Sequence, residues 1–212
     1  MTDTDFAQDS PSKAIETILL AAEVEFAERG FDGAGMKAIS KRAGLSQALL
    51  HYHFGTKDGL YEEVIGQRST KINDERMQLL TKVDMSSPEA VDGILEALFR
   101  PPLGPSGGAK PYARIFSGLI VGRERDQALV KEYYDPTATK FIAALQTALP
   151  GTDRPTAAMC YTLSLGALIA VIGRDGRVER LMGRSAKQDI DDYLKSIVAF
   201  AKGGVLALAA QS

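Results

Sequence analysis

Two short segments, residues 36–43 and 47–54, lie on either side of Gly44 and limit the fold of this chain more than any other feature. Each segment carries apolar residues at helical spacing. Gly44 can end the first because glycine accepts a positive φ, and Ser46 can cap the second with its hydroxyl. The pattern predicts two short helices joined by a tight turn. Such a pair can place one helix in the major groove of DNA, about 12 Å wide, while the other braces it.

The two helices are expected to have an apolar inner face and a polar outer face. The inner face should pack against the preceding helix and comprises Met36, Ile39, Ala43, Leu45, Leu50 and Phe54. On the outer face, Gln47 can bond adenine through both amide atoms, and Ala48 and Leu49 can contact a thymine methyl group. The residues predicted to meet DNA are Gly35, Met36, Lys37, Ser46, Gln47, Ala48, Leu49, His51, Tyr52, His53 and Lys57.

The distribution of charge supports this prediction although the net charge is −2. Residues 35–57 contain no Asp or Glu but four cations, Lys37, Lys41, Arg42 and Lys57. The rest of the chain is therefore acidic. A basic island on an acidic body suits contact with a polyanion at one end of the molecule. Lys57 begins the next predicted helix, where a positive side chain and free backbone N–H groups can hold a phosphate.

Helical patterns continue through the remaining chain and predict an all-α protein of about nine helices. Ile15, Ile18, Leu19, Ala22 and Phe26 form one face of a first helix that Gly30 can end. We expect residues 1–10 to be a flexible tail, 11–57 a three-helix DNA-binding domain, and 58–212 a bundle of about six helices. Residues 101–111 are predicted to form a loop because of their prolines and glycines, and 173–185 a charged connection.

The segment GFDGAGMKAISKRAGLSQALLHYHFGTKDGLYEEVI resembles the DNA-binding segment of the TetR family of bacterial regulators. The resemblance covers about residues 12–65 and rests on Gly30, Phe31, Ile39, Ala43, Gly44, Ser46, Leu50, Phe54, Lys57 and Leu60. It implies three N-terminal helices that bind DNA and about six C-terminal helices that dimerise and bind a small ligand. It also implies repression that the ligand relieves.

Four positions depart from the family pattern. Gly35 stands where the family often has a threonine that caps the second helix. Ala48 and Leu49 replace a small residue and a threonine, and His51 replaces a frequent tyrosine. The operator sequence therefore cannot be taken from a relative.

The second half of the chain offers candidates for a ligand pocket and for a dimer interface. An aromatic and thioether set could line an apolar pocket with hydroxyl groups, or it could be ordinary core packing; its members are Tyr112, Phe116, Leu119, Tyr133, Tyr134, Met159 and Tyr161. Arg114, Arg123 and Arg125 could anchor a carboxylate or form surface ion pairs. The small residues of 155–173, with the last helix, suit a four-helix dimer interface, which the resemblance implies, or an internal bundle core.

Several other classes of protein are not expected. His51 and His53 point about 200° apart on a helix, so they do not form a metal site, and we predict no cofactor. No nucleophile motif or phosphate-binding loop is present, so we expect no enzyme. The single cysteine, Cys160, excludes an intramolecular disulfide. The chain has no uninterrupted run of about 18 apolar residues and no signal peptide, which favours a cytoplasmic protein without a membrane span.

We conclude from the sequence that the chain is a homodimeric DNA-binding regulator, and we expect a repressor that a small, largely apolar ligand releases from a palindromic operator. Two alternatives stay open. One is a DNA-binding protein that does not switch. The other is a helical small-molecule-binding domain whose DNA motif is vestigial.

Overall fold

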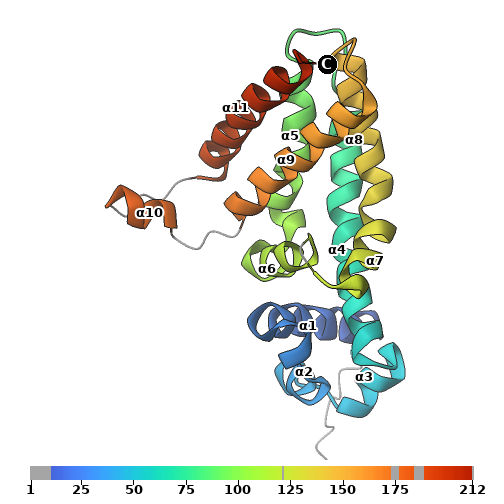
Figure 1. Ribbon diagram of the computed structural model, residues 1–212. Coiled ribbons are helices and arrows are strands. Elements are labelled where there is room, and N and C mark those ends of the chain that lie inside the picture. The colour runs from blue at the N-terminus through green and yellow to red at the C-terminus, as the bar shows by residue number, and fades with distance from the viewer. Residues whose placement is uncertain (1–10, 121, 173–176, 184–188, 212) are drawn as a thin grey trace, which may run out of the picture. The chain divides into compact units, whose positions relative to one another are not determined.

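The computed structural model describes residues 11–120, 122–172, 177–183 and 189–211, so the predicted tail at 1–10 lies outside the described residues. Every regular element within these ranges is helical, which confirms the predicted all-α class. The chain folds into two compact units, with the boundary between Gly66 and Gln67 (Figure 1). This boundary falls inside a helix, beyond the limit at residue 57 that the sequence suggested.

The first unit contains three helices and the start of a fourth: α1 (Pro11–Gly33), α2 (Met36–Ala43), α3 (Gln47–Phe54) and α4 (Lys57–Leu80). α1 is kinked at Gly30, where φ is 66°, so its regular part ends where the sequence predicted. Its predicted apolar face is buried at Ile18, Leu19, Ala22 and Phe26. Phe26 and Phe31 pack against the ring of Tyr61 in α4, with ring centroids 4.9 and 5.1 Å away.

The second unit is a helical bundle in which α5 packs against α8, α9 and α11. Its elements after α4 are α5 (Ala90–Leu103), a 3-10 turn η1 (Pro105–Gly107), α6 (Ala109–Ile120), α7 (Glu124–Tyr133), α8 (Asp135–Ala148), α9 (Arg154–Ile172), α10 (Arg177–Met182) and α11 (Ile190–Ala209). Two ion pairs join α11 to α5, Arg100–Asp191 at 3.3 Å and Lys202–Asp92 at 2.6 Å. The predicted break at Asp135–Pro136 separates α7 from α8.

The predicted loop at 101–111 is wrong, because helix covers most of these residues. α5 continues through Pro101 and Pro102 to Leu103, and α6 already begins at Ala109. A proline in the last turn of a helix removes only one backbone donor, and a proline in the first turn, such as Pro111, removes a donor that has no intrahelical acceptor. The predicted connection at 173–185 likewise contains α10.

One helix of the described residues, α9, is long and apolar enough to cross a membrane by length and composition alone. This corrects the expectation from sequence that the chain has no such stretch. Core helices of soluble proteins meet the same criterion, and α9 packs against α6, α8 and α11 of the bundle. Only 33% of its most apolar window is buried, however, which leaves an unusually apolar surface on this unit.

Candidate nucleic-acid interface

The corner between α2 and α3 has the geometry that its sequence predicts. Gly44 adopts the left-handed conformation, with φ 69° and ψ 23°, and its N–H donates to the Lys41 carbonyl. The Ser46 hydroxyl caps α3 by accepting from the N–H of Leu49 at 3.2 Å. On the inner face, Met36, Ile39 and Leu50 are buried. These contacts fix the direction in which α3 presents its outer face.

The outer face of α3 projects into solvent. Ser46, Gln47, Ala48, His51 and Tyr52 are exposed, and 83% of Tyr52 is accessible. Leu49 and His53 are half-buried. A tyrosine this exposed, on a helix whose opposite face is packed, contributes nothing to the core of its own unit. Of the predicted base-reading residues, Gln47, Ala48 and His51 therefore lie on an accessible surface, whereas Leu49 is only partly accessible.

Gln47 and His51 are joined by a hydrogen bond on this surface. The His51 Nδ1 lies 2.8 Å from the Gly55 carbonyl oxygen, which can only accept, so Nδ1 carries a proton and donates. In the neutral ring Nε2 is then an acceptor, and the Gln47 amide nitrogen lies 3.3 Å from it. The bond uses one of the two amide protons. The other proton and the amide oxygen remain, and these are the two groups that a bidentate contact with adenine requires.

His53 is half-buried, and its ring lies near the rings of Tyr52 and Phe54. Its centroid lies 5.1 Å from that of Tyr52 and 6.1 Å from that of Phe54. At the start of α2, Gly35 has an extended backbone and provides no side-chain cap, and Met36 is buried. Of the predicted DNA-facing residues before the turn, Lys37 alone presents an exposed side chain.

The four cations of residues 35–57 differ in what they contact. The Lys57 ammonium donates to the carbonyls of Phe31 and Ala34 at 2.9 and 3.1 Å, and lies 4.4 Å from the centre of the Phe31 ring. Its side chain is therefore turned inward, and a phosphate contact from its ammonium would compete with these bonds. Arg42 pairs with Glu25 and Glu28 of α1, and its hydrogen bond with Glu25 raises the pKa of its guanidinium.

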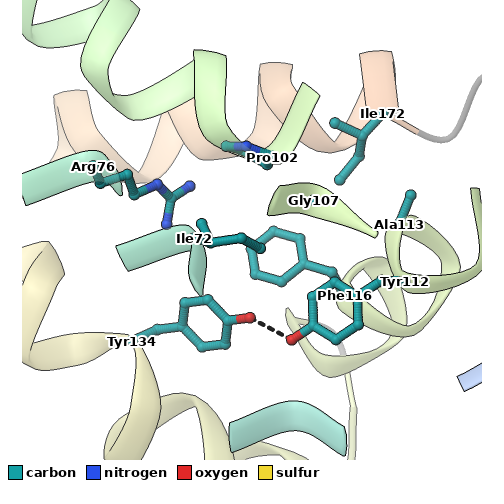
Figure 2. A pocket seen from close by; sticks show the side chains of 9 residues that line it. All are labelled: Ile72, Arg76, Pro102, Gly107, Tyr112, Ala113, Phe116, Tyr134 and Ile172. Carbon is teal, nitrogen blue, oxygen red and sulfur yellow. Dashed lines mark hydrogen bonds between the residues drawn. The ribbon is translucent and has the colours of Figure 1, made fainter. Parts of the chain in front are cut away.

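The candidate ligand residues of the second unit occupy different environments. Tyr112 and Phe116 line a pocket together with Ile72, Arg76 and Tyr134, as Figure 2 shows. The remaining candidates do not line this pocket: Leu119 and Tyr161 are buried, Tyr133 is half-buried and Met159 is exposed on α9. The hydroxyls of Tyr112 and Tyr134 are hydrogen-bonded at 2.5 Å. Burial raises the pKa of Tyr134 to about 12, so this hydroxyl is protonated and can donate.

Arg76 is the charged pocket residue that the sequence analysis missed. The other lining residues that it did not name are Ile72, Pro102, Gly107, Ala113 and Ile172. It lies on a stripe of α4 formed by Ile65, Ser69, Ile72, Arg76 and Leu80, all of which are buried. These positions recur every three or four residues, which is the spacing of a buried helix face. That spacing was the available signal, but neighbouring charged residues gave this part of α4 the appearance of a solvated helix. The three arginines named from the sequence, Arg114, Arg123 and Arg125, are exposed or half-buried and do not line the pocket.

Two family models match the chain. The model described as "Bacterial regulatory proteins, tetR family" matches residues 18–64, which contain α2 and α3. The model described as "Tetracyclin repressor-like, C-terminal domain" matches residues 93–204, more than half of the chain. The two matches fall in the two structural units.

Characterised relatives match over shorter stretches. The HTH-type transcriptional activator FasR of Mycolicibacterium smegmatis is 34% identical over 83 residues, which are 39% of this chain and 37% of that protein. The biofilm operon icaADBC HTH-type negative transcriptional regulator IcaR of Staphylococcus aureus is 28% identical over 130 residues, 54% of this chain and 66% of that protein. The matched stretch thus spans about a third of one relative and just under two thirds of the other.

Solved structures with the same fold extend over nearly the whole chain. A putative transcriptional regulator from Pseudomonas aeruginosa PAO1 superimposes with a TM-score of 0.67 at 14% identity, covering 100% of this chain and 99% of that one. A putative TetR-family regulator from Mesorhizobium loti MAFF303099 gives 0.62 at 16% identity, covering 93% and 97%. Family and relatives are regulators rather than enzymes. From the helix-turn-helix corner and the two model matches together, the chain belongs to the TetR family of bacterial regulatory proteins.

Proposed function

We propose that this protein is a homodimeric transcriptional regulator that binds a palindromic operator through α3 and responds to a small ligand bound in its second unit. The observation that carries the proposal is the outer face of α3. Gln47, Ala48, His51 and Tyr52 are all exposed there, while the opposite face of the helix is anchored by the buried Leu50. A packed helix that presents a polar, accessible face at a tight corner is suited to the major groove.

The exposed cations support contact with the DNA backbone. Lys37 and Lys41 of α2 are exposed, and residues 35–57 contain no carboxylate that would repel phosphate. The first-turn N–H groups of α2 lack a side-chain cap, so they too can bond a phosphate oxygen. We assign base reading to the face of α3, and phosphate contact to Lys37 and Tyr52 together with the N-terminus of α4 at Lys57.

An apolar groove supports dimerisation of the second unit. It has a volume of about 340 Å³ and runs between α9 and α11, lined by Cys160, Leu163, Ser164, Ala167, Phe200, Ala201, Gly204, Val205 and Leu208. Leu163 is 56% exposed and Phe200 75% exposed. Two large apolar side chains beside an open groove favour a partner, and a second copy of the same face would cover both. A dimer can then read two half-sites of a palindrome.

The direction of regulation is proposed from the relatives. IcaR, a negative regulator, matches over more of this chain than FasR, an activator, so we propose repression. Ligand binding would shift the protein between two arrangements by differential affinity, and α4 is the proposed lever because it continues from the first unit into the second. The pocket lining suggests a small ligand with an apolar body, and the cytoplasm is the proposed location.

Selection of bound duplexes from a random pool tests the proposal. We expect one enriched palindromic sequence that is protected in a footprint. Gln47→Ala should weaken binding to that sequence by about 1 to 3 kcal/mol and relax the preference at one base pair in each half-site. Gln78→Ala, an exposed glutamine of α4 in the second unit, should bind like the unaltered protein. Absence of any enriched sequence, or equal affinity of the Gln47→Ala variant, would contradict the proposal.

A further inference from the structure

The guanidinium of Arg76 is buried inside the second unit, with 1% of the residue exposed. Its Nε donates to the Leu98 carbonyl at 3.0 Å and its Nη1 to the Asn73 side-chain oxygen at 3.3 Å. Its Nη2 has no hydrogen-bond partner among the described residues. One end of the guanidinium is therefore held in place while the other end is unused.

A structural role explains the contact of Nε. In a regular helix the Leu98 carbonyl would accept from the backbone of residue 102, but Pro102 has no N–H. Arg76 supplies the missing donor. A neutral amide of similar length, such as glutamine, could also supply it, so this contact does not account for a positive charge.

The charge of Arg76 is not neutralised by the described residues. No carboxylate forms an ion pair with it there; the groups that interact with it electrostatically are the hydroxyls of Tyr161, Tyr134 and Tyr112. Burial lowers the pKa of Arg76, yet a guanidinium stays protonated in proteins. Burying an unpaired charge destabilises the fold, so a bound anion would relieve that destabilisation.

Arg76 is one of the residues that line the pocket in Figure 2, and its Nη2 has no hydrogen-bond partner among the described residues. Tyr134 lines the same pocket, and when Tyr112 is the donor in the hydrogen bond between their hydroxyls, the Tyr134 proton is available to a ligand. Ile72, Phe116 and Ile172 provide apolar walls. The pocket therefore offers one cationic group, one hydroxyl donor and a hydrophobic surround.

We propose that this pocket binds a monocarboxylate with a short apolar body, whose carboxylate pairs with Arg76 and accepts from Tyr134. A single guanidinium in an apolar surround matches one negative charge, and its planar fork suits a carboxylate. The inference rests on the proposed ligand response and names the chemistry of that ligand. The cavity measures about 10 Å³, room for about one water molecule, so the ligand's body enters by widening the pocket. That widening is the conformational difference to which a regulator can respond.

Calorimetric titration of the full chain tests the ligand class. The probes are sodium butyrate, benzoate and phenylacetate, at constant ionic strength set with sodium chloride, and each has its primary amide as a neutral counterpart. We expect saturable binding of at least one carboxylate, with its amide weaker by about tenfold or more. Failure of all three carboxylates to bind saturably, or equal binding of acid and amide, would overturn the proposal. A buried water at Nη2 would be the remaining explanation in that case.

Variants assign the binding to Arg76. Arg76→Gln keeps a donor for the Leu98 carbonyl but removes the charge, so carboxylate affinity should fall about tenfold or more. Arg114→Gln, which alters an exposed arginine of α6, should bind as the unaltered chain does. Tyr134→Phe leaves Arg76 in place and should weaken binding by a smaller factor, which keeps the test valid if Arg76→Gln fails to fold. Unchanged binding in both Arg76→Gln and Tyr134→Phe would exclude this site.

The two proposals can fail separately. Selection of operator DNA requires no carboxylate, and calorimetry requires no DNA. A chain that selects an operator but binds none of the probes would refute the carboxylate site alone. A chain that binds a probe through Arg76 but selects no sequence would refute the proposed regulation alone.

Discussion

Some of the cations in residues 35–57 bond other groups of the protein, and the others are exposed to solvent. Arg42 joins α2 to α1 through Glu25, whose carboxylate is buried and also pairs with Arg29 at 2.7 Å. Lys57 is bound by carbonyls that follow the kink of α1. Lys37 and Lys41 remain in solvent. At the scale of single residues, a count of cations in the sequence therefore overestimates the charge that can face DNA.

Replacing Lys57 should lower the stability of the first unit as well as any DNA affinity. Lys57→Met keeps the apolar stem but removes the ammonium that bonds Phe31 and Ala34. We expect a loss of about 1 to 2 kcal/mol in the free energy of unfolding, because carbonyls close to the core lose a charged donor. Thermal melts followed by circular dichroism measure this. Lys41→Met, at an exposed lysine, serves as the control, and equal melting of the two variants would contradict the structural role.

Alkaline titration should reveal the burial of Tyr134. Its pKa is raised to about 12 from 10.0, mainly by burial, so folding favours the neutral phenol. The corresponding stability, about 2 to 3 kcal/mol from a shift of this size, is fully present below pH 10 and lost as the pH rises towards 12. Ultraviolet titration of tyrosinate should show Tyr134 ionising late, and Tyr134→Phe should remove that late step.

Tyr52→Phe, at a tyrosine that is 83% exposed, is the control for this titration, since it should leave the late step in place. Burial also raises the pKa of Tyr161, so this tyrosine is expected to ionise late as well. Ionisation of all seven tyrosines in one step near pH 10 would contradict the buried hydroxyl pair.

At the scale of elements, local signals predicted the DNA-binding corner better than they predicted the second unit. Gly44 and Ser46 act within a few residues of themselves, so the bounds of α2 and α3 could be predicted without any distant contact. Where α5 continues through Pro101 and Pro102, the Leu98 carbonyl loses its backbone donor and instead accepts a hydrogen bond from Arg76, more than twenty residues earlier. Such a contact between distant segments has no local signature in the sequence.

Two glycine substitutions around α2 should change stability in opposite directions. Gly44→Ala places a side chain at φ 69°, where L-residues are strained, and should cost about 1 kcal/mol. Gly35→Ser occupies an extended N-cap with open space around its Cβ position and adds the missing cap, so it should stabilise by about 0.5 kcal/mol. Chemical denaturation measures both. Equal stability of the two variants would contradict both the predicted strain at residue 44 and the predicted stabilisation by a cap at residue 35.

At the scale of the whole molecule, the exposed apolar side chains and the acid-free basic stretch belong to different units of the chain. The exposed apolar side chains of α9 and α11 lie in the second unit, whereas the acid-free stretch lies in the first. One side of α9 is packed inside the second unit and another side is exposed, since Leu168 is fully buried while Leu163 is 56% exposed. A helix apolar on every side requires a second packing surface. The proposed dimer would supply that surface for α9.

Introducing charge into the groove should therefore separate the protomers. Phe200→Glu replaces a side chain that is 75% exposed in the single chain, so it should leave the fold of the second unit intact and act on the dimer alone. Sedimentation at micromolar concentration should show a monomer, and affinity for a duplex with two half-sites should fall by about tenfold or more because the half-sites no longer bind as a unit. Leu181→Glu, on an equally exposed leucine of α10, should remain dimeric. A Phe200→Glu variant that sediments as a dimer, or a monomer that binds the operator at full affinity, would refute the groove as the interface.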